Sequence, residues 1–278
     1  MSTLSVAKKD FLDVRRAKIV WFVGGLYTLF AVLFFYLGQY NNPNPDVRYQ
    51  LFTLSSIGAL FIPLIALVAA YLAVAGERES GSIKYLLSLP NTRRDVVLGK
   101  YLSRAAVVSV SVVLAFVVGA ALTVLWYPDL HIDVFASVVA LTVLFTIGYV
   151  AIAIGISAAT KSRSRAMGGA IGFYFVGNLL MIFPGLSIIE GLDYLFNSLL
   201  GLGVSDNVLE FIRMLSPTMA FVQSMALTIP DDLAGVQAEF SGDVPFYLEP
   251  EAALVVLIAW LVVPVALGLW RFSRADLG

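Results

Sequence analysis

A glycine-rich stretch, Gly76-Glu-Arg-Glu-Ser-Gly81, has the glycine spacing of a loop that could hold a nucleotide phosphate. In such a loop the second glycine is followed by Lys and then by Ser or Thr, because the lysine reaches the outer phosphates and the hydroxyl binds Mg²⁺. Ser82 and Ile83 stand at those two positions instead. The stretch therefore predicts no nucleotide site in this chain.

His131 is the only histidine of the chain, and it lies in a short loop between Asp129 and Asp133. One imidazole and two loop carboxylates make a poor metal site, so a solvated turn is the favoured interpretation. The chain also has no cysteine, and it lacks the HExxH and GxSxG patterns of hydrolases. We therefore expect no enzyme activity, and no metal or cofactor bound by this chain.

The elements that carry these residues are those of a membrane protein. Of the 278 residues, 59% are hydrophobic and 13% charged, with a mean hydropathy of +0.88, whereas soluble domains have about 25% charged residues. About 20 apolar residues cross a bilayer. Six runs are long enough: about 19–39, 52–75, 102–126, 134–159, 167–188 and 252–270. The sequence predicts an all-α, polytopic fold with six transmembrane helices in one domain, residues 1–278.

None of these six runs carries Asp, Glu, Lys, Arg or His near its middle. Charged residues in mid-membrane mark ion and proton pathways, and Asn178 in the fifth run is the clearest strongly polar side chain there. An ion-driven carrier needs such a site. A coupled secondary transporter is therefore disfavoured.

The basic residues indicate which side of the membrane each loop faces. With the N-terminus inside, all of the 18 Lys and Arg residues except Arg48 and Arg213 fall on the inner side, and most acidic residues fall outside. Both termini are therefore expected to be cytoplasmic, with the loop 76–101 inside and the segment 189–251 outside.

Two flanking segments mix apolar and polar residues. Residues 6–18 predict a short amphipathic helix at the inner interface, with a plain basic anchor as the alternative. In the outer segment, Ser205 is a candidate helix N-cap, and Ser216-Pro217 has the pattern of a second helix start. The acidic residues 231–251, broken by Gly and Pro, predict a solvated loop.

Small residues form two candidate packing faces. Gly168 and Gly172 make a GxxxG pattern, and Ala151, Gly155 and Ala159 are spaced four apart. Such faces let helices approach closely. Packing within the chain and contact with a second subunit both fit this pattern.

The inner loop 76–101 has internal order. Residues 82–89 predict a short amphipathic helix, which Pro90 stops. Thr92 and Asp95 have the spacing of a capping box, from which a new helix would run into the third span. A short apolar and basic helix held between two spans could lie on anionic lipid or dock a partner subunit.

With these residues in place, the chain resembles the type-2 ATP-binding-cassette exporter permeases, in the branch that includes the nitrous-oxide-reductase maturation permease. The resemblance covers the whole topology, and its specific motif lies in the inner loop. The matching positions are Glu77, Gly81, Ser82, Ile83, Leu86, Leu87, Ser88, Pro90, Arg93, Gly99 and Lys100. The family's usual Thr after the glycine is Ser82 here.

The resemblance implies that the inner loop is a coupling helix seated in a separate ATPase subunit, which binds ATP and Mg²⁺. Glu77 and Glu79 would face that subunit, and Lys84, Tyr85, Leu87 and Ser88 would contact it. It also implies a homodimer or heterodimer of permease chains that meet at the first, second and fifth spans. The outer helices of 206–228, entered at Ser216 and Pro217, would gate the path.

The resemblance thus implies a permease subunit of an ABC exporter in a prokaryotic plasma membrane, driven by ATP hydrolysis in a partner and binding no nucleic acid. The lack of a P-loop and of mid-membrane charge agrees with energy entering from another chain. Two alternatives stay open: a membrane-embedded assembly or maturation factor, and a membrane anchor for a soluble partner. The cargo is not indicated.

Overall fold

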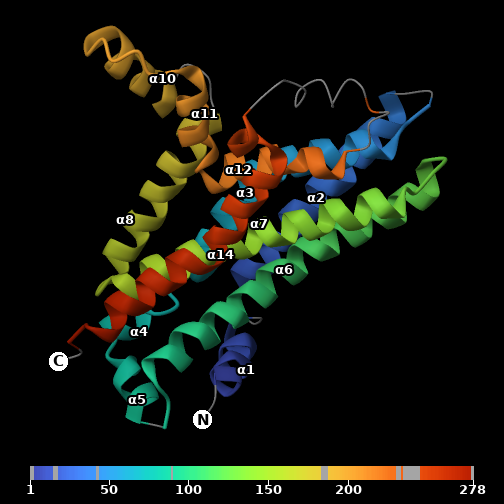
Figure 1. Ribbon diagram of the computed structural model, residues 1–278. Coiled ribbons are helices and arrows are strands. Elements are labelled where there is room, and N and C mark those ends of the chain that lie inside the picture. The colour runs from blue at the N-terminus through green and yellow to red at the C-terminus, as the bar shows by residue number, and fades with distance from the viewer. Residues whose placement is uncertain are drawn as a thin grey trace.

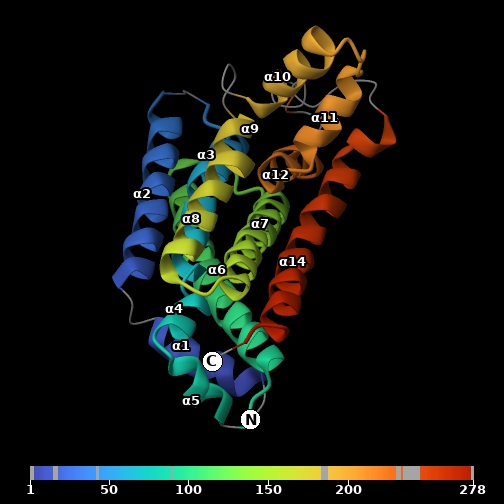
Figure 2. The same ribbon diagram turned by 90° about the vertical axis from the view of Figure 1, so that its left-hand side faces the viewer.

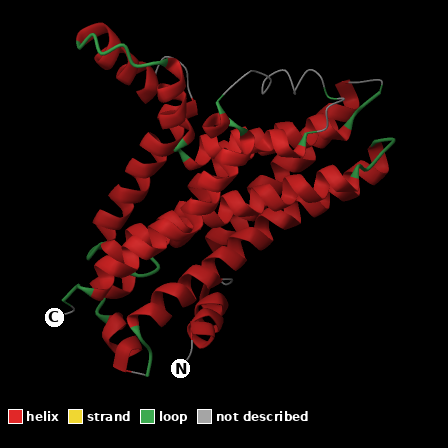
Figure 3. Cartoon of the chain, in the orientation of Figure 1, coloured by secondary structure: helices red, strands yellow, loops and turns green. Residues whose placement is uncertain are grey.

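The computed structural model describes residues 3–14, 18–41, 44–88, 90–182, 187–229, 233 and 245–276. These residues form helices joined by short loops, with no strand among them (Figure 3). The all-α prediction is therefore confirmed for the described part of the chain. Most of the predicted solvated loop 231–251 lies outside the described residues.

The described chain contains both long helices and short ones. The long helices are α2 (Lys18–Asn41), α3 (Val47–Ala70), α6 (Arg93–Trp126), α7 (Ile132–Ala159) and α14 (Pro250–Ser273). Helix α8 (Arg163–Tyr174) is shorter, but it continues as one helical segment to Ile182. The short ones are α1 (Thr3–Val14), α4 (Ala75–Glu79), α5 (Ser82–Ser88), α9 (Leu180–Ile182), α10 (Ile188–Asp193), α11 (Asp206–Met214) and α12 (Pro217–Ser224). Single π or 3-10 turns are η1 (Phe175–Leu179), η2 (Tyr194–Leu199), η3 (Met225–Thr228) and η4 (Phe246–Leu248).

Five helical segments of the described chain are long and apolar enough to cross a membrane: Val47–Glu79, Arg93–Trp126, Ile132–Ala159, Arg163–Ile182 and Pro250–Ser273. The first expected span falls in α2, whose 24 residues make a helix of about 36 Å at 1.5 Å per residue. The side chains of 18–23 lie outside the described residues, so the count of six spans stays a prediction.

The core of the bundle is α7, which is buried over most of its length. Helix α14 crosses it where Gly155 and Gly268 meet: a Cβ on Gly268 would lie 2.6 Å from the Gly155 carbonyl oxygen, and one on Gly155 would collide with the Pro264 backbone. This close approach needs glycine on both helices. Packing within the chain is therefore confirmed for the face that contains Gly155.

The two ends of the bundle differ. Figures 1 and 2 show α1, α4, α5 and the end of α14 at one end, and α10 and α11 at the other. The N-terminal helix and the end of the last helix thus share one end, as expected for two termini on one side of a membrane. We call it the terminal end; that it faces the cytoplasm stays a prediction.

The second and fifth expected spans end earlier than predicted. The second, expected over 52–75, ends as α3 at Ala70, and the chain turns before α4. Ser157 of α7 explains the break, because its Oγ accepts hydrogen bonds from the backbone N–H groups of Val74 and Ala75, both at 3.0 Å. The fifth, expected over 167–188, runs from Arg163 through η1 to Ile182.

Candidate functional site

The inner loop folds as two short helices at a sharp turn. Gly81 joins α4 to α5 with φ of +75°, a left-handed conformation that favours glycine. Helix α5 ends at Ser88, before Pro90, and Thr92 opens α6 with the predicted capping box: Thr92 Oγ1 accepts from Asp95 N, and Asp95 Oδ2 accepts from Thr92 N. We call residues 75–92 the hairpin.

A cluster of buried charges ties the hairpin to α6 and to the N-terminal helix. Lys100 Nζ lies 2.8 Å from Glu77 Oε1 and 3.1 Å from Asp10 Oδ1. Arg104 Nε donates to Asp10 Oδ2 at 2.9 Å, and its Nη1 donates to the Ala69 carbonyl at 2.7 Å. Burial raises the pKa of Asp10, but Lys100 and Arg104 outweigh it and hold that pKa below its ordinary value. Asp10 is therefore a charged partner for both cations.

Helix α1 packs on α6 beside this cluster. Val6 and Thr3 lie so close to α6 that a Cβ on Gly99 would be 2.7 Å from Val6 Cβ and 2.8 Å from the Thr3 carbonyl oxygen. Thr3 Oγ1 also donates to Asp95 Oδ1 at 2.6 Å. The predicted amphipathic helix is thus present, somewhat earlier than 6–18, and its buried face contacts protein. Gly99 and Lys100 of the family motif hold α1 in place.

A second set of contacts ties the end of α14 to the hairpin through Arg78 and to the start of α6 through Arg93. Arg93 Nη1 donates to the carbonyl oxygens of Phe272, Ser273 and Ala275, at 2.5, 2.9 and 2.7 Å. Arg78 Nη1 donates to Thr160 O at 2.7 Å. The guanidinium carbons of Arg78 and Arg93 both lie 5.4 Å from the ring centre of buried Phe272. Cations above an aromatic face are attracted to it, so Phe272 joins the two arginines.

The predicted coupling residues divide into an inward and an outward group. Glu77 pairs with Lys100, Glu79 Oε2 accepts from the backbone N–H of Arg163, and Arg93 binds the end of α14. Gly81 and Leu87 are half-buried. On α5 the exposed residues are Ser82, Lys84, Tyr85 and Ser88, and Tyr85 is 80% exposed. We call these four the α5 surface. Glu79 on α4 is also exposed, although it contacts the start of α8.

The roles of the inward group could not be read from local sequence. The family resemblance predicts that Glu77 and Glu79 face the partner subunit, which stays a prediction. In the structure both bind other parts of the same chain. Asp10 and Phe272 were missed altogether, because their partners are 90 and about 180 residues away. The only signal was the family motif itself, which contains Glu77 and Lys100.

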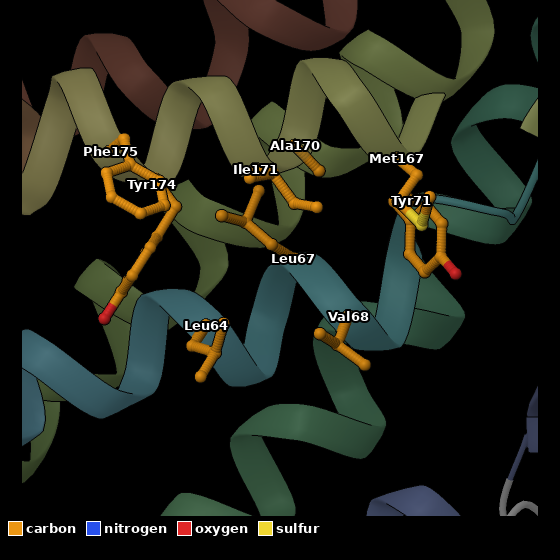
Figure 4. A pocket seen from close by; sticks show the side chains of 9 residues that line it. All are labelled: Leu64, Leu67, Val68, Tyr71, Met167, Ala170, Ile171, Tyr174 and Phe175. Carbon is orange, nitrogen blue, oxygen red and sulfur yellow. The ribbon is translucent and has the colours of Figure 1, made fainter. Parts of the chain in front are cut away.

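An apolar groove runs between α3 and α8, with a volume of about 370 Å³. Figure 4 shows its lining side chains on the two helices: Leu64, Leu67, Val68, Tyr71, Met167, Ala170, Ile171, Tyr174 and Phe175. From the groove toward α10 and α11, helix α8 diverges from the long helices (Figure 1). A Cβ on Gly168 or Gly172 would meet no described atom within 4 Å. This GxxxG face has no packing partner among the described residues.

A buried polar junction joins helix α12 to α3, η1 and α7. Asn178 Nδ2, in the π turn η1, donates to Ala59 O at 2.9 Å and to Thr218 Oγ1 at 3.0 Å. The Tyr149 hydroxyl lies 2.6 Å from the same Thr218 oxygen. Ser216 caps α12 as predicted and donates to Gly177 O at 2.7 Å. Single π turns are frequent at functional sites, and this one places Asn178 at the junction.

With this arrangement in view, comparison with known proteins decides the family. Residues 4–277 match the family described as ABC-2 family transporter protein. The chain belongs to this ABC-2 family. Two relatives, from Pseudomonas aeruginosa and Stutzerimonas stutzeri, are both named "Probable ABC transporter permease protein NosY". Each is 24% identical to this chain, with 97% of this chain and 97% of the relative aligned.

The predicted family and branch are therefore confirmed. An ABC-2 permease with five apolar helices in its described residues is a multi-pass membrane protein. Both relatives are bacterial, which is consistent with a prokaryotic plasma membrane. The hairpin, the α3–α8 groove and the α12 junction are thus features of an ABC transporter permease subunit.

Proposed function

We propose that this ABC-2 permease couples ATP hydrolysis in a separate ATPase subunit to export, and that the hairpin is the coupling element. The observation that supports it is the division of motif residues. Glu77 of the hairpin pairs with Lys100 of α6, and Lys100 also pairs with Asp10 of α1. Arg93 at the start of α6 binds the end of α14, while the α5 surface is left free at the terminal end. A displacement of α5 would therefore be transmitted to α1, α6 and α14, because ion pairs and hydrogen bonds to backbone carbonyls connect these elements rigidly.

The transport path lies, on this proposal, between two permease chains. The α3–α8 groove and the bare glycine face at Gly168 and Gly172 support the second and fifth spans as part of the subunit contact. Small residues drive helix association in membranes. Helix α12, entered at Ser216-Pro217, would gate the outer end through the Asn178 and Thr218 junction.

Co-purification tests the partner. Expressed together with a candidate ABC ATPase from the same organism, tagged permease is expected to retain the ATPase in detergent. A Lys84→Glu, Tyr85→Ala double variant should lose about 90% of it, because both residues lie on the exposed α5 surface. Substitution of Leu202 and Phe246 at the opposite end, which are 62% and 77% exposed, is the control and should change nothing. Equal ATPase retention by all three proteins would contradict the proposed docking site.

A further inference from the structure

A second pocket lies at the terminal end of the bundle, between the end of α7, the start of α8 and the end of α14. Its volume is about 480 Å³, within the range of roughly 300–1,000 Å³ that is usual for ligand sites. Basic side chains dominate its lining: Arg78, Lys161, Arg165, Arg271 and Arg274, together with Trp270. One carboxylate, that of Asp276, shares the wall. We call it the basic pocket.

Five cations and one carboxylate line this pocket, so its basic side chains outnumber its acidic one. Among the described residues, no carboxylate forms a salt bridge with Lys161, Arg165 or Arg271. All three are exposed. Five cations converging on one concave surface repel one another and favour an anion between them. A phosphate group suits this arrangement because guanidinium groups bind its oxygens in pairs.

The pocket also continues an apolar strip on α14. Val263, Leu267 and Trp270 follow one another at i, i+4 and i+7, so they share one face of the helix. Their side chains are 49, 61 and 52% exposed. Arg274 lies 4.4 Å from the Trp270 ring centre, directly beyond the strip. Tryptophan is enriched where a span meets the lipid headgroups, so the strip leads from the hydrocarbon region to the cations.

We propose that the basic pocket binds the phosphate headgroup of an anionic phospholipid, whose acyl chains lie along the strip on α14. Basic pockets between transmembrane helices bind such headgroups. An apolar strip that ends at clustered arginines matches an amphiphile, which has both acyl chains and an anionic headgroup. A free anion would contact the arginines but not the strip. The proposal needs α14 to span the bilayer, and it does not depend on ATPase docking.

The position of Arg78 connects lipid binding to the stability of the fold. Arg78 lines the basic pocket and also contacts Phe272 and the end of α7. A headgroup beside Arg78 would stabilise the contacts that lock α14 to the hairpin, since a ligand stabilises the state that binds it. The lipid would therefore raise the thermal stability of the permease.

The test compares lipids on the purified full-length chain in detergent. Phosphatidylglycerol is expected to raise Tm and to remain bound in native mass spectrometry, whereas phosphatidylcholine does neither. The triple variant Lys161→Gln, Arg165→Gln, Arg271→Gln should weaken phosphatidylglycerol binding about tenfold or more. Its Tm in phosphatidylcholine should equal that of the unaltered chain, which shows that it folds.

The matched control is Lys8→Gln, Lys9→Gln, Arg94→Gln, which removes three exposed charges at the same end and should leave binding unchanged. An equal loss of phosphatidylglycerol binding in this control would show a general attraction between basic residues and anionic lipid, and it would overturn the proposal. Protection by inorganic phosphate or glycerol phosphate equal to that by the lipid would also overturn it. So would unchanged lipid binding in the triple variant together with lost ATPase co-purification, because the pocket would then be a protein contact.

Discussion

Carboxylates placed together at Gly81 and Leu87 are expected to uncouple ATP hydrolysis from transport. Gly81 holds the α4–α5 turn at φ of +75°, which L side chains rarely adopt, and Leu87 packs half-buried against the bundle core. Gly81→Asp strains the turn, and Leu87→Asp puts a charge into an apolar contact. The hairpin would then no longer move with α6 and α14. We expect ATPase-driven transport in proteoliposomes to fall about tenfold or more, while the bound ATPase still hydrolyses ATP.

The control for this double variant is a pair of carboxylates at the other end of the bundle. Leu202→Asp, Phe246→Asp adds the same charge at exposed positions, and we expect coupled transport to persist. Tm in detergent, measured for both, separates uncoupling from unfolding. Normal coupling in the Gly81 and Leu87 variant would show that the hairpin does not transmit the ATPase stroke.

Loss of the Asp10 carboxylate is expected to destabilise the permease strongly. Asp10→Ala leaves Arg104 without its carboxylate and Lys100 with Glu77 alone, in a region where Asp10 is 7% and Lys100 4% exposed. Removing one partner of a buried ion pair costs about 3–5 kcal/mol, and Arg104 keeps one backbone acceptor, so we expect about 3 kcal/mol. Thermal unfolding in detergent measures it, and Asp13→Ala, on the exposed side of the same helix, is the matched control. Equal Tm values in the two variants would contradict the role of the cluster.

The same cluster predicts a pH dependence. The pKa of Asp10 lies below its ordinary value of 3.8 in the folded chain. Its stabilising contribution is therefore fully present above about pH 5 and is lost as the pH falls through the lowered pKa. The difference in Tm between the unaltered chain and Asp10→Ala should be constant from pH 5 to pH 8 on this account. It should shrink below about pH 4.

Local sequence signals predicted the ends of several helices well. The capping box at Thr92, the stop before Pro90 and the Ser216-Pro217 helix start are each written in a few neighbouring residues. Their physical cause is local: side chains satisfy backbone N–H groups next to them. Hydropathy runs likewise located the helices, since bilayer thickness sets their length.

The contacts that give the hairpin its role are not local. Arg93 and the carbonyls of 272–275 are about 180 residues apart, and periodicity cannot say which helix ends meet. The break between Ala70 and Ala75 depends on Ser157, a residue of another helix. The two small-residue faces look alike in sequence, yet Gly155 packs on α14 while Gly168 meets nothing described. Whether a small-residue face is buried or exposed depends on how the helices pack together, which the local sequence does not specify.

The measurement that tests the account most directly uses the absence of cysteine from the chain. Tyr85→Cys places a single thiol on the α5 surface, and Phe246→Cys places one at the opposite end. We expect a membrane-impermeant maleimide to label Phe246→Cys in intact cells and Tyr85→Cys only in inverted vesicles. Bound ATPase should then protect Tyr85→Cys alone. Labelling of Tyr85→Cys from outside, or no protection by the ATPase, would contradict the assignment of the hairpin as the coupling element.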